Sequence, residues 1–135
     1  MSSAELVTGQ GRTAIADVVV QKIAGIAASD VAGVHNLGGG TARAMGALRE
    51  RIPGAARSSG QGVSVEVGER QTAVDLALVV EYGVSIPDLA QSIRRNVITS
   101  IERMTGLEVT EVNIDVDDVH LPDDNDDGSN ESRVQ

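Results

Sequence analysis

Apolar residues recur at helical spacing in two parts of the chain, and each part predicts an amphipathic helix. The first stripe comprises Ile15, Val19, Ile23 and Ile26. The second comprises Ile86, Ala90, Ile93, Val97, Ile101 and Met104. Ser85 and Asp88 have the spacing of a capping box before the second helix, and Gly106 is placed to end it. Gly25 lowers helix propensity within the first helix, so we expect it to mark a close backbone contact.

Alternation of apolar and polar residues predicts strands elsewhere. Residues 63–67 and 73–82 alternate on either side of a short polar turn, which is typical of an antiparallel hairpin with one apolar face. A shorter strand is expected within residues 31–37, before three consecutive glycines.

The last alternating segment covers residues 112–117. Val109 is out of phase with Val112, which predicts a β-bulge near Thr110 and Glu111. In chain order, we therefore expect helix, strand, weak helix, strand, strand, helix and strand. Strands with one apolar face need helices on that face only, so the predicted fold class is α+β. The domain would have two layers: a mainly antiparallel sheet of about four strands, with two main helices on one face.

Composition divides the chain into a body and two polar ends. Residues 1–12 are polar and predict a flexible lead, whereas residues 13–121 contain nearly all of the periodic hydrophobicity and form the predicted domain. Within the domain, residues 38–62 form a variable insert rich in glycine and arginine, with a weak helix over residues 41–52 and a loop after it. Residues 122–135 contain many acids and one apolar residue, which predicts a disordered acidic tail.

Charge and composition exclude several classes of function. The chain has 20 acidic and 11 basic side chains, a formal net charge of −9, and Tyr82 as its one aromatic residue. Nucleic acid would be repelled on average and would find no aromatic stacking platform, so no nucleic-acid partner is expected. The absence of cysteine excludes disulfides and cysteine-based zinc sites. No signal peptide and no apolar run of membrane-spanning length is visible, so we expect a cytoplasmic location.

Two basic segments with apolar residues are candidate interaction surfaces. The first, in the insert, contains Arg43, Met45, Leu48, Arg49 and Arg51. The second, on the long helix, contains Arg94, Arg95, Ile98 and Arg103. Each segment can present apolar side chains among arginines to a partner or an anionic surface. Alternatively, each can bury its apolar side against the body and leave the arginines in water.

Candidate chemistry is sparse. His35 and His120 are the two histidines, and no Gly-x-Ser-x-Gly nucleophile elbow accompanies them, so we assign no catalytic residue and expect no enzyme. His120 follows Asp115 and Asp117, a set that could bind a metal, although strand alternation places His120 on the opposite side from both. The Gly38–Thr41 turn could offer backbone N–H groups to a phosphate. A small-ligand or metal-binding module therefore stays open as an alternative, with no cofactor assigned.

Three blocks of the sequence, in order, resemble those of a known family. They include the motifs Lys22-Ile23-Ala24-Gly25-Ile26-Ala27-Ala28, Ala73-Val-Asp-Leu-Ala-Leu-Val-Val-Glu-Tyr-Gly83 and Glu111-Val112-Asn113-Ile114. Over about residues 10–121, the chain resembles the bacterial alkaline shock protein (Asp/Gls-type) envelope stress response family. Its arginine usage and its Gly-Gly-Gly-Thr-Ala-Arg-Ala insert resemble the actinobacterial branch of that family.

The resemblance implies a small, non-enzymatic protein of the envelope stress response that acts through its surfaces. It implies self-association as a homo-oligomer and binding to a small membrane anchor protein. Contact with the membrane would then be indirect, at the inner face of the cell membrane. The family brings no catalytic residues and no small-molecule substrate to this chain.

Overall fold

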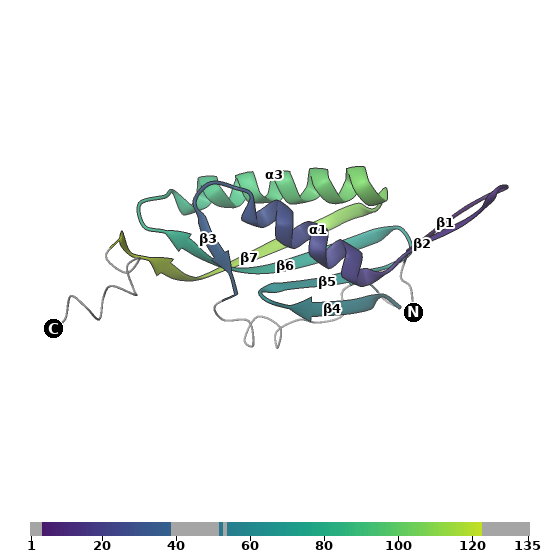
Figure 1. The fold of residues 1–135 in the computed structure, drawn as a ribbon, viewed down its shortest axis with the longest axis horizontal. Coiled ribbons are helices and arrows are strands. Elements are labelled where there is room, and N and C mark those ends of the chain that lie inside the picture. The colour runs from purple at the N-terminus through teal and green to yellow at the C-terminus, as the bar shows by residue number, and fades with distance from the viewer. Residues whose placement is uncertain (1–3, 39–51, 53, 123–135) are drawn as a thin grey trace.

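The computed structural model describes residues 4–38, 52 and 54–122, and it is a β-sheet with two helices on one face (Figure 1). In chain order, the described elements are β1 (Ala4–Thr8), β2 (Gly11–Ile15), α1 (Asp17–Ser29), β3 (Val34–Leu37), β4 (Ala56–Gly60), β5 (Val63–Val67), β6 (Gln71–Glu81), α3 (Ile86–Thr105) and β7 (Glu108–His120). The predicted α+β fold is confirmed, and the main sheet has five described strands rather than about four. The weak helix predicted for residues 41–52, apart from Ile52, and the acidic tail after Pro122 lie outside the described residues.

Strand β6 is the centre of the main sheet. β5 pairs antiparallel with residues 72–76 of β6, and β3 pairs antiparallel with residues 78–80 of the same strand. β3 and β5 therefore lie end to end along one edge of β6. β7 pairs in parallel with β6 along the other edge, and β4 pairs with β5 at the outside. Helix α3 provides the crossover connection that a parallel pair requires. The bulge predicted near Thr110 is confirmed, because the β6–β7 register shifts there.

Both helices pack on the face of the sheet that carries its aliphatic residues. The buried apolar side chains from the strands include Val63, Val65, Val67, Val74, Leu76, Leu78, Val80 and Val112. Those from the helices are Val20, Ile23, Ala24, Ala27, Ala28, Leu89, Ile93, Val97 and Ile101. The helices also contact each other, since the Asn96 side-chain amide donates a hydrogen bond to the Ala27 carbonyl at 2.7 Å. Neither described helix combines the length and the apolar character needed to cross a membrane.

The stripe predicted for α1 is partly wrong. Ile23 is buried as predicted, but Val19 and Ile26 are exposed. Ala24 and Ala27 are buried instead, because the face of α1 that meets both the sheet and α3 accommodates small side chains. The buried face of α1 is therefore rotated about the helix axis away from the stripe of larger apolar residues that the sequence predicts.

Helix α3 begins and ends where predicted. The Ser85 hydroxyl accepts a hydrogen bond from the Asp88 backbone N–H at 3.4 Å. Gly106 ends the helix with a φ of 78°, a conformation that favours glycine. The centre of the predicted stripe is buried, whereas Ile86 and Met104 at the two ends of the helix are exposed.

The flexible lead predicted for residues 1–12 is corrected by the structure. β1 and β2 form a separate antiparallel hairpin that projects from the main sheet (Figure 1). Leu6 and Val7 are exposed in this hairpin, and Arg12 forms an ion pair with Glu5 at 3.0 Å. So little of the hairpin is buried that its sequence has no clear apolar alternation, which explains why the sequence predicts a flexible lead there.

The loop predicted after the weak helix is also wrong, because β4 lies there and pairs with β5. A polar strand at the edge of a sheet has no apolar pattern, and polar edges protect sheets from pairing with other chains. The β5–β6 hairpin is confirmed, but its second face is not simply polar. Ser64 and Glu66 are buried on that face, where the Ile52 backbone N–H donates to the Glu66 carboxylate at 3.2 Å.

Candidate functional site

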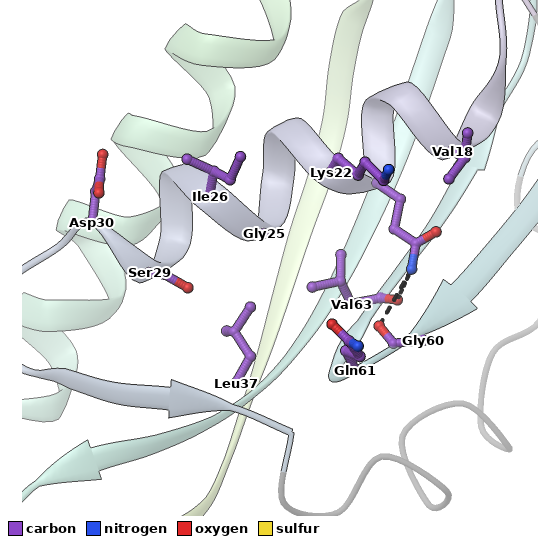
Figure 2. Close-up of a pocket in the computed structure, with 11 residues that line it drawn as sticks. Val18, Lys22, Gly25, Ile26, Ser29, Asp30, Leu37, Gly60, Gln61 and Val63 are labelled. Carbon is purple, nitrogen blue, oxygen red and sulfur yellow. Dashed lines mark hydrogen bonds between the residues drawn. The ribbon is translucent and has the colours of Figure 1, made fainter.

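A groove lies beside α1, where the helix crosses the junction between β3 and β5 (Figure 2). It has a volume of about 580 Å³ and is lined by Val18, Gln21, Lys22, Gly25, Ile26, Ser29, Asp30, Leu37, Gly60, Gln61 and Val63. The two strands meet at Ala77 of β6, whose carbonyl accepts from the Gly38 N–H at 3.0 Å and whose N–H donates to the Gly62 carbonyl at 2.8 Å. A Cβ at Gly62 would overlap the Gly38 backbone, so glycine is required for this close approach.

At one end of the groove, Gln21 fastens α1 to the turn between β4 and β5. Its side-chain nitrogen donates hydrogen bonds to the carbonyls of Gly60 at 3.3 Å and Val63 at 3.4 Å. Its side-chain oxygen accepts a hydrogen bond from the Ser58 hydroxyl. Gln21 therefore holds one wall of the groove in place.

The groove exposes apolar surface to solvent. On α1, the exposed fraction is 66% for Ile26 and 43% for Val18. Leu37 at the end of β3 and Val63 at the start of β5 form the opposite wall (Figure 2). A concave apolar surface with a few polar groups at its edge is the usual form of a binding site for an apolar group.

Gly25 faces this groove from the middle of α1. A Cβ at Gly25 would lie 3.4 Å from Val63 Cγ2 and 3.7 Å from Leu37 Cδ1, which is ordinary van der Waals contact. The close backbone contact predicted at this glycine is therefore wrong. Because alanine would fit and would favour the helix, the packing of this domain does not explain the glycine. Because residue 25 has no side chain, the groove is wider there than it would be with alanine.

A second group of polar side chains lies on the other face of the sheet, at the end of β6. The Glu81 carboxylate accepts a hydrogen bond at 3.0 Å from Nδ1 of His35, in β3, and another at 3.0 Å from Nδ1 of His120, in β7. The two imidazole rings stack with their centroids 3.8 Å apart and 10° between their planes. The exposed fraction of the side chain is 34% for His35, 44% for Glu81 and 17% for His120.

The electrostatics of this His35–Glu81–His120 cluster favour the ionised carboxylate. Hydrogen bonds from His120 and then from His35 hold the pKa of the Glu81 carboxyl below its ordinary value. Within the described residues, this is the one group of three histidine or acidic side chains whose candidate ligand atoms lie within 4.8 Å of one another.

The metal-binding set considered from the sequence is corrected here. The structure brings His120 to Glu81 and His35 rather than to Asp115 and Asp117. The prediction that His120 lies on the opposite face of the strand from Asp115 is also wrong, because a bulge in β7 shifts the register between Val116 and Asp118. After this bulge, His120 lies opposite Glu81, on the same face of the sheet as Asp115.

The basic surfaces predicted from the sequence are only partly within the described residues. Arg43, Met45, Leu48, Arg49 and Arg51 lie outside them. On α3, Arg94, Arg95 and Arg103 are exposed. The Arg94 side chain also donates a hydrogen bond to the Val112 carbonyl at 3.0 Å, and Ile98 is half-buried against the core rather than exposed.

The phosphate site considered at Gly38–Thr41 lies outside the described residues except for Gly38. Its N–H donates to the Ala77 carbonyl in the sheet and is therefore occupied.

Sequence reasoning missed both the α1 groove and the role of Glu81. Gly25 is the one signal of the groove in the sequence, and a glycine within a helix equally predicts a tight backbone contact. Glu81 has no distinctive spacing from either histidine, because the three residues meet only through strand pairing. The presence of just two histidines in the chain was the remaining signal for this cluster.

The chain has relatives among known proteins. A "stress response regulator gls24 homolog" of Streptococcus pyogenes is 37% identical over 110 residues, which cover 82% of this chain and 59% of the relative. Two Bacillus subtilis proteins, both described as uncharacterized, are also similar. YqhY is 35% identical over 81% of this chain and 77% of its own length. YloU is 27% identical over 88% of this chain and 97% of its own length. The chain thus spans little more than half of the streptococcal relative. No solved structure gave a significant match.

These relatives come from Streptococcus and Bacillus, so the actinobacterial branch expected from the sequence stays a prediction. The family model that matches the chain covers residues 5–121, which is nearly all of the described structure. It describes a family with a cell envelope-related function. This protein therefore belongs to the alkaline shock protein 23 family.

Proposed function

We propose that the protein is a non-enzymatic interaction module of the cell-envelope stress response, and that it binds an apolar segment of a partner protein in the α1 groove. The description of its family and the names of its relatives refer to the envelope and to stress response rather than to a reaction. The relatives' names do not identify a partner, so the partner is inferred from the chemistry of this chain.

The observation that carries this proposal is the combination of Gly25 with exposed Ile26. A glycine inside a helix costs roughly 0.5–1 kcal/mol relative to alanine. Here alanine would meet only ordinary contacts, so the glycine costs stability without a benefit to the fold. Ile26, next to it, leaves 66% of its surface in water. Both features are explained if a partner's side chain occupies the groove.

The net charge indicates what kind of partner would bind. A chain with a formal charge of −9 repels a second copy on average and attracts a basic segment. Membrane proteins have an excess of lysine and arginine beside their membrane spans on the cytoplasmic side. An apolar segment with basic neighbours, at the cytoplasmic end of a small membrane anchor protein, would therefore match the groove and the charge. Such binding would place the protein at the inner face of the membrane without direct insertion.

Self-association is a separate part of the proposal, and it would use a different surface. Arg95 and Arg103 are exposed on α3, on a chain that is acidic as a whole. A basic helix of one copy facing an acidic surface of another would offset the average repulsion between copies.

Site-specific photo-crosslinking in the native cell tests the groove directly. A photoreactive phenylalanine analogue would replace Ile26 in one variant and Met104 in the other. The two positions are matched, because their side chains are 66% and 65% exposed and both lie on helices. We expect the variant at position 26 to form an adduct with a protein extracted from the membrane fraction. The variant at position 104 should not form this adduct.

The mass of the adduct distinguishes the possible partners. An adduct of twice the mass of the chain at position 26 would show that a second copy occupies the groove, and would contradict an anchor as occupant. Equal adducts at positions 26 and 104, or none at either, would contradict the groove as a binding site. An adduct that disappears when Gly25 is replaced by leucine would locate the contact inside the groove.

A further inference from the structure

We propose that His35, Glu81 and His120 form a binding site for a divalent transition-metal ion, with zinc as the representative ion. This site lies on the opposite face of the sheet from α1 and does not depend on the proposed binding groove. Imidazole nitrogen and carboxylate oxygen together suit zinc, nickel, copper and iron, whereas magnesium and calcium prefer oxygen ligands alone.

The candidate ligand atoms of the cluster already lie within 4.8 Å of one another, and the side chains would rearrange locally to accept an ion. His35 Nδ1 lies 3.0 Å from Glu81 Oε2, and His120 Nδ1 lies 3.0 Å from Glu81 Oε1. Two ligand atoms bound to one tetrahedral zinc at bond lengths of about 2.1 Å are about 3.4 Å apart. Each of these two N–O pairs would therefore lengthen by about 0.4 Å as the ion replaces the proton between them. The stacked rings would also rotate so that their lone pairs converge on the ion.

Backbone pairing holds the three ligands at the same level of the sheet. The Glu81 N–H donates to the Gly33 carbonyl at 2.9 Å, on the side of β3. The Tyr82 N–H donates to the His120 carbonyl at 3.1 Å, on the side of β7. An ion would thus enter a site whose main chain is already ordered, which reduces the entropic cost of binding.

Two irregularities of the sheet create this arrangement. In β3, Val34 lies opposite Val80 while Asn36 lies opposite Val79, so His35 is the extra residue of a bulge. In β7, a second register shift precedes His120 and brings it opposite Glu81. Bulges redirect side chains and occur often beside functional sites. Here two bulges, in different strands, bring both histidines of the chain to one carboxylate.

The donor set leaves room for a fourth ligand. Three protein ligands with partly exposed side chains leave the remaining tetrahedral position to water or to a group from another molecule. The ion would link β3, β6 and β7 at the end of the sheet that is farther from the β1–β2 hairpin (Figure 1). We therefore expect zinc to stabilise the folded chain, because the folded state has the assembled site and the unfolded state does not.

Isothermal titration of the full chain with zinc chloride at neutral pH tests this site. We expect one zinc ion per chain, and an affinity lowered at least about tenfold in His35→Gln, Glu81→Gln and His120→Gln. Asp115→Asn is the matched control, since Asp115 lies on the same face of β7 outside the cluster, and its affinity should equal that of the wild type. Circular dichroism of each variant confirms that it is folded at the temperature of the titration.

A second measurement separates the histidine cluster from the acidic tail. The chain has two histidines, so the imidazole proton resonances in an NMR spectrum are easily assigned with one variant. Zinc should shift both sets of resonances, and magnesium at the same concentration should shift neither. Zinc binding without any imidazole shift would place the ion at exposed carboxylates and overturn the proposal. No zinc binding at all would also overturn it, and would leave the cluster as a hydrogen-bonded link between strands.

Discussion

The imidazole rings of His35 and His120 stack 3.8 Å apart, although the strands that carry them lie on opposite edges of β6. Glu81 is the residue of β6 between them, and its carboxylate is hydrogen-bonded to both rings. Three strands are therefore linked by one carboxylate on the face of the sheet opposite α1 and α3. The protonation state of Glu81 should consequently affect the stability of the whole sheet edge.

Replacement of Glu81 by glutamine should change how stability depends on pH. The pKa of Glu81 is lowered in the folded chain, first by the hydrogen bond from His120 and then by that from His35. A carboxyl with a lowered folded pKa stabilises the fold above its ordinary pKa of 4.5, and this contribution is lost as pH falls through the folded pKa. Urea unfolding should thus show wild type more stable than Glu81→Gln near neutral pH, with the difference shrinking below pH 4.5.

Glu69→Gln is the matched control for this pH dependence, because Glu69 is exposed in the turn before β6. Its difference from the wild type should stay nearly constant over the same pH range. A Glu81→Gln difference that is also constant, or that grows as pH falls, would show that the hydrogen bonds to the histidines do not stabilise the fold.

Alanine substitutions at Gly25 and Gly106 should have opposite effects on stability. Gly25→Ala adds helix propensity and makes only ordinary contacts, so we expect stabilisation of roughly 0.5–1 kcal/mol. Gly106 has a φ of 78°, so alanine there should destabilise the fold by about 1 kcal/mol, although nothing lies within 4 Å of its added Cβ. Thermal and urea unfolding measure both. Destabilisation by Gly25→Ala would show that α1 cannot accept a methyl group at the groove.

Ser85→Ala should weaken the start of α3. The serine hydroxyl satisfies the Asp88 N–H, but at 3.4 Å and in an exposed position. We therefore expect a loss near the lower end of the usual range for an N-cap, about 0.5–1 kcal/mol, in urea unfolding. Ser85→Asp should retain the cap and stay within about 0.5 kcal/mol of the wild type. Equal losses in both variants would indicate that the hydroxyl does not act as the cap.

The parts of the fold that could be predicted from the sequence are those with strong local signals. The capping residues around α3 and the alternation in β5 and β6 depend on neighbours in the chain, and the structure confirms them. The bulge near Thr110 was visible because it breaks the phase of a clear alternation. By contrast, β1, β2 and β4 bury little or lie at an edge, so their sequences are not constrained to alternate.

The functional features depend on pairing between distant segments, and local patterns do not record such pairing. His35, Glu81 and His120 meet because of register and two bulges, and the second bulge reverses the facing that simple alternation predicts for His120. The groove depends on where α1 crosses the junction of β3 and β5. The same glycine in the sequence is compatible with a tight contact or an open groove, and only the surrounding atoms distinguish the two.

Truncation of Ile101 and of Met104 tests which face of α3 is buried. Ile101 is fully buried against the sheet, so Ile101→Ala removes apolar contacts and leaves a cavity, with an expected loss of about 2–5 kcal/mol. Met104 belongs to the same stripe predicted from the sequence but is 65% exposed, so Met104→Ala should change stability by no more than about 0.5 kcal/mol. Urea unfolding at neutral pH measures both. Similar losses at the two positions would mean that another surface covers Met104 in solution, and a concentration-dependent loss would identify that surface as a second copy of the chain.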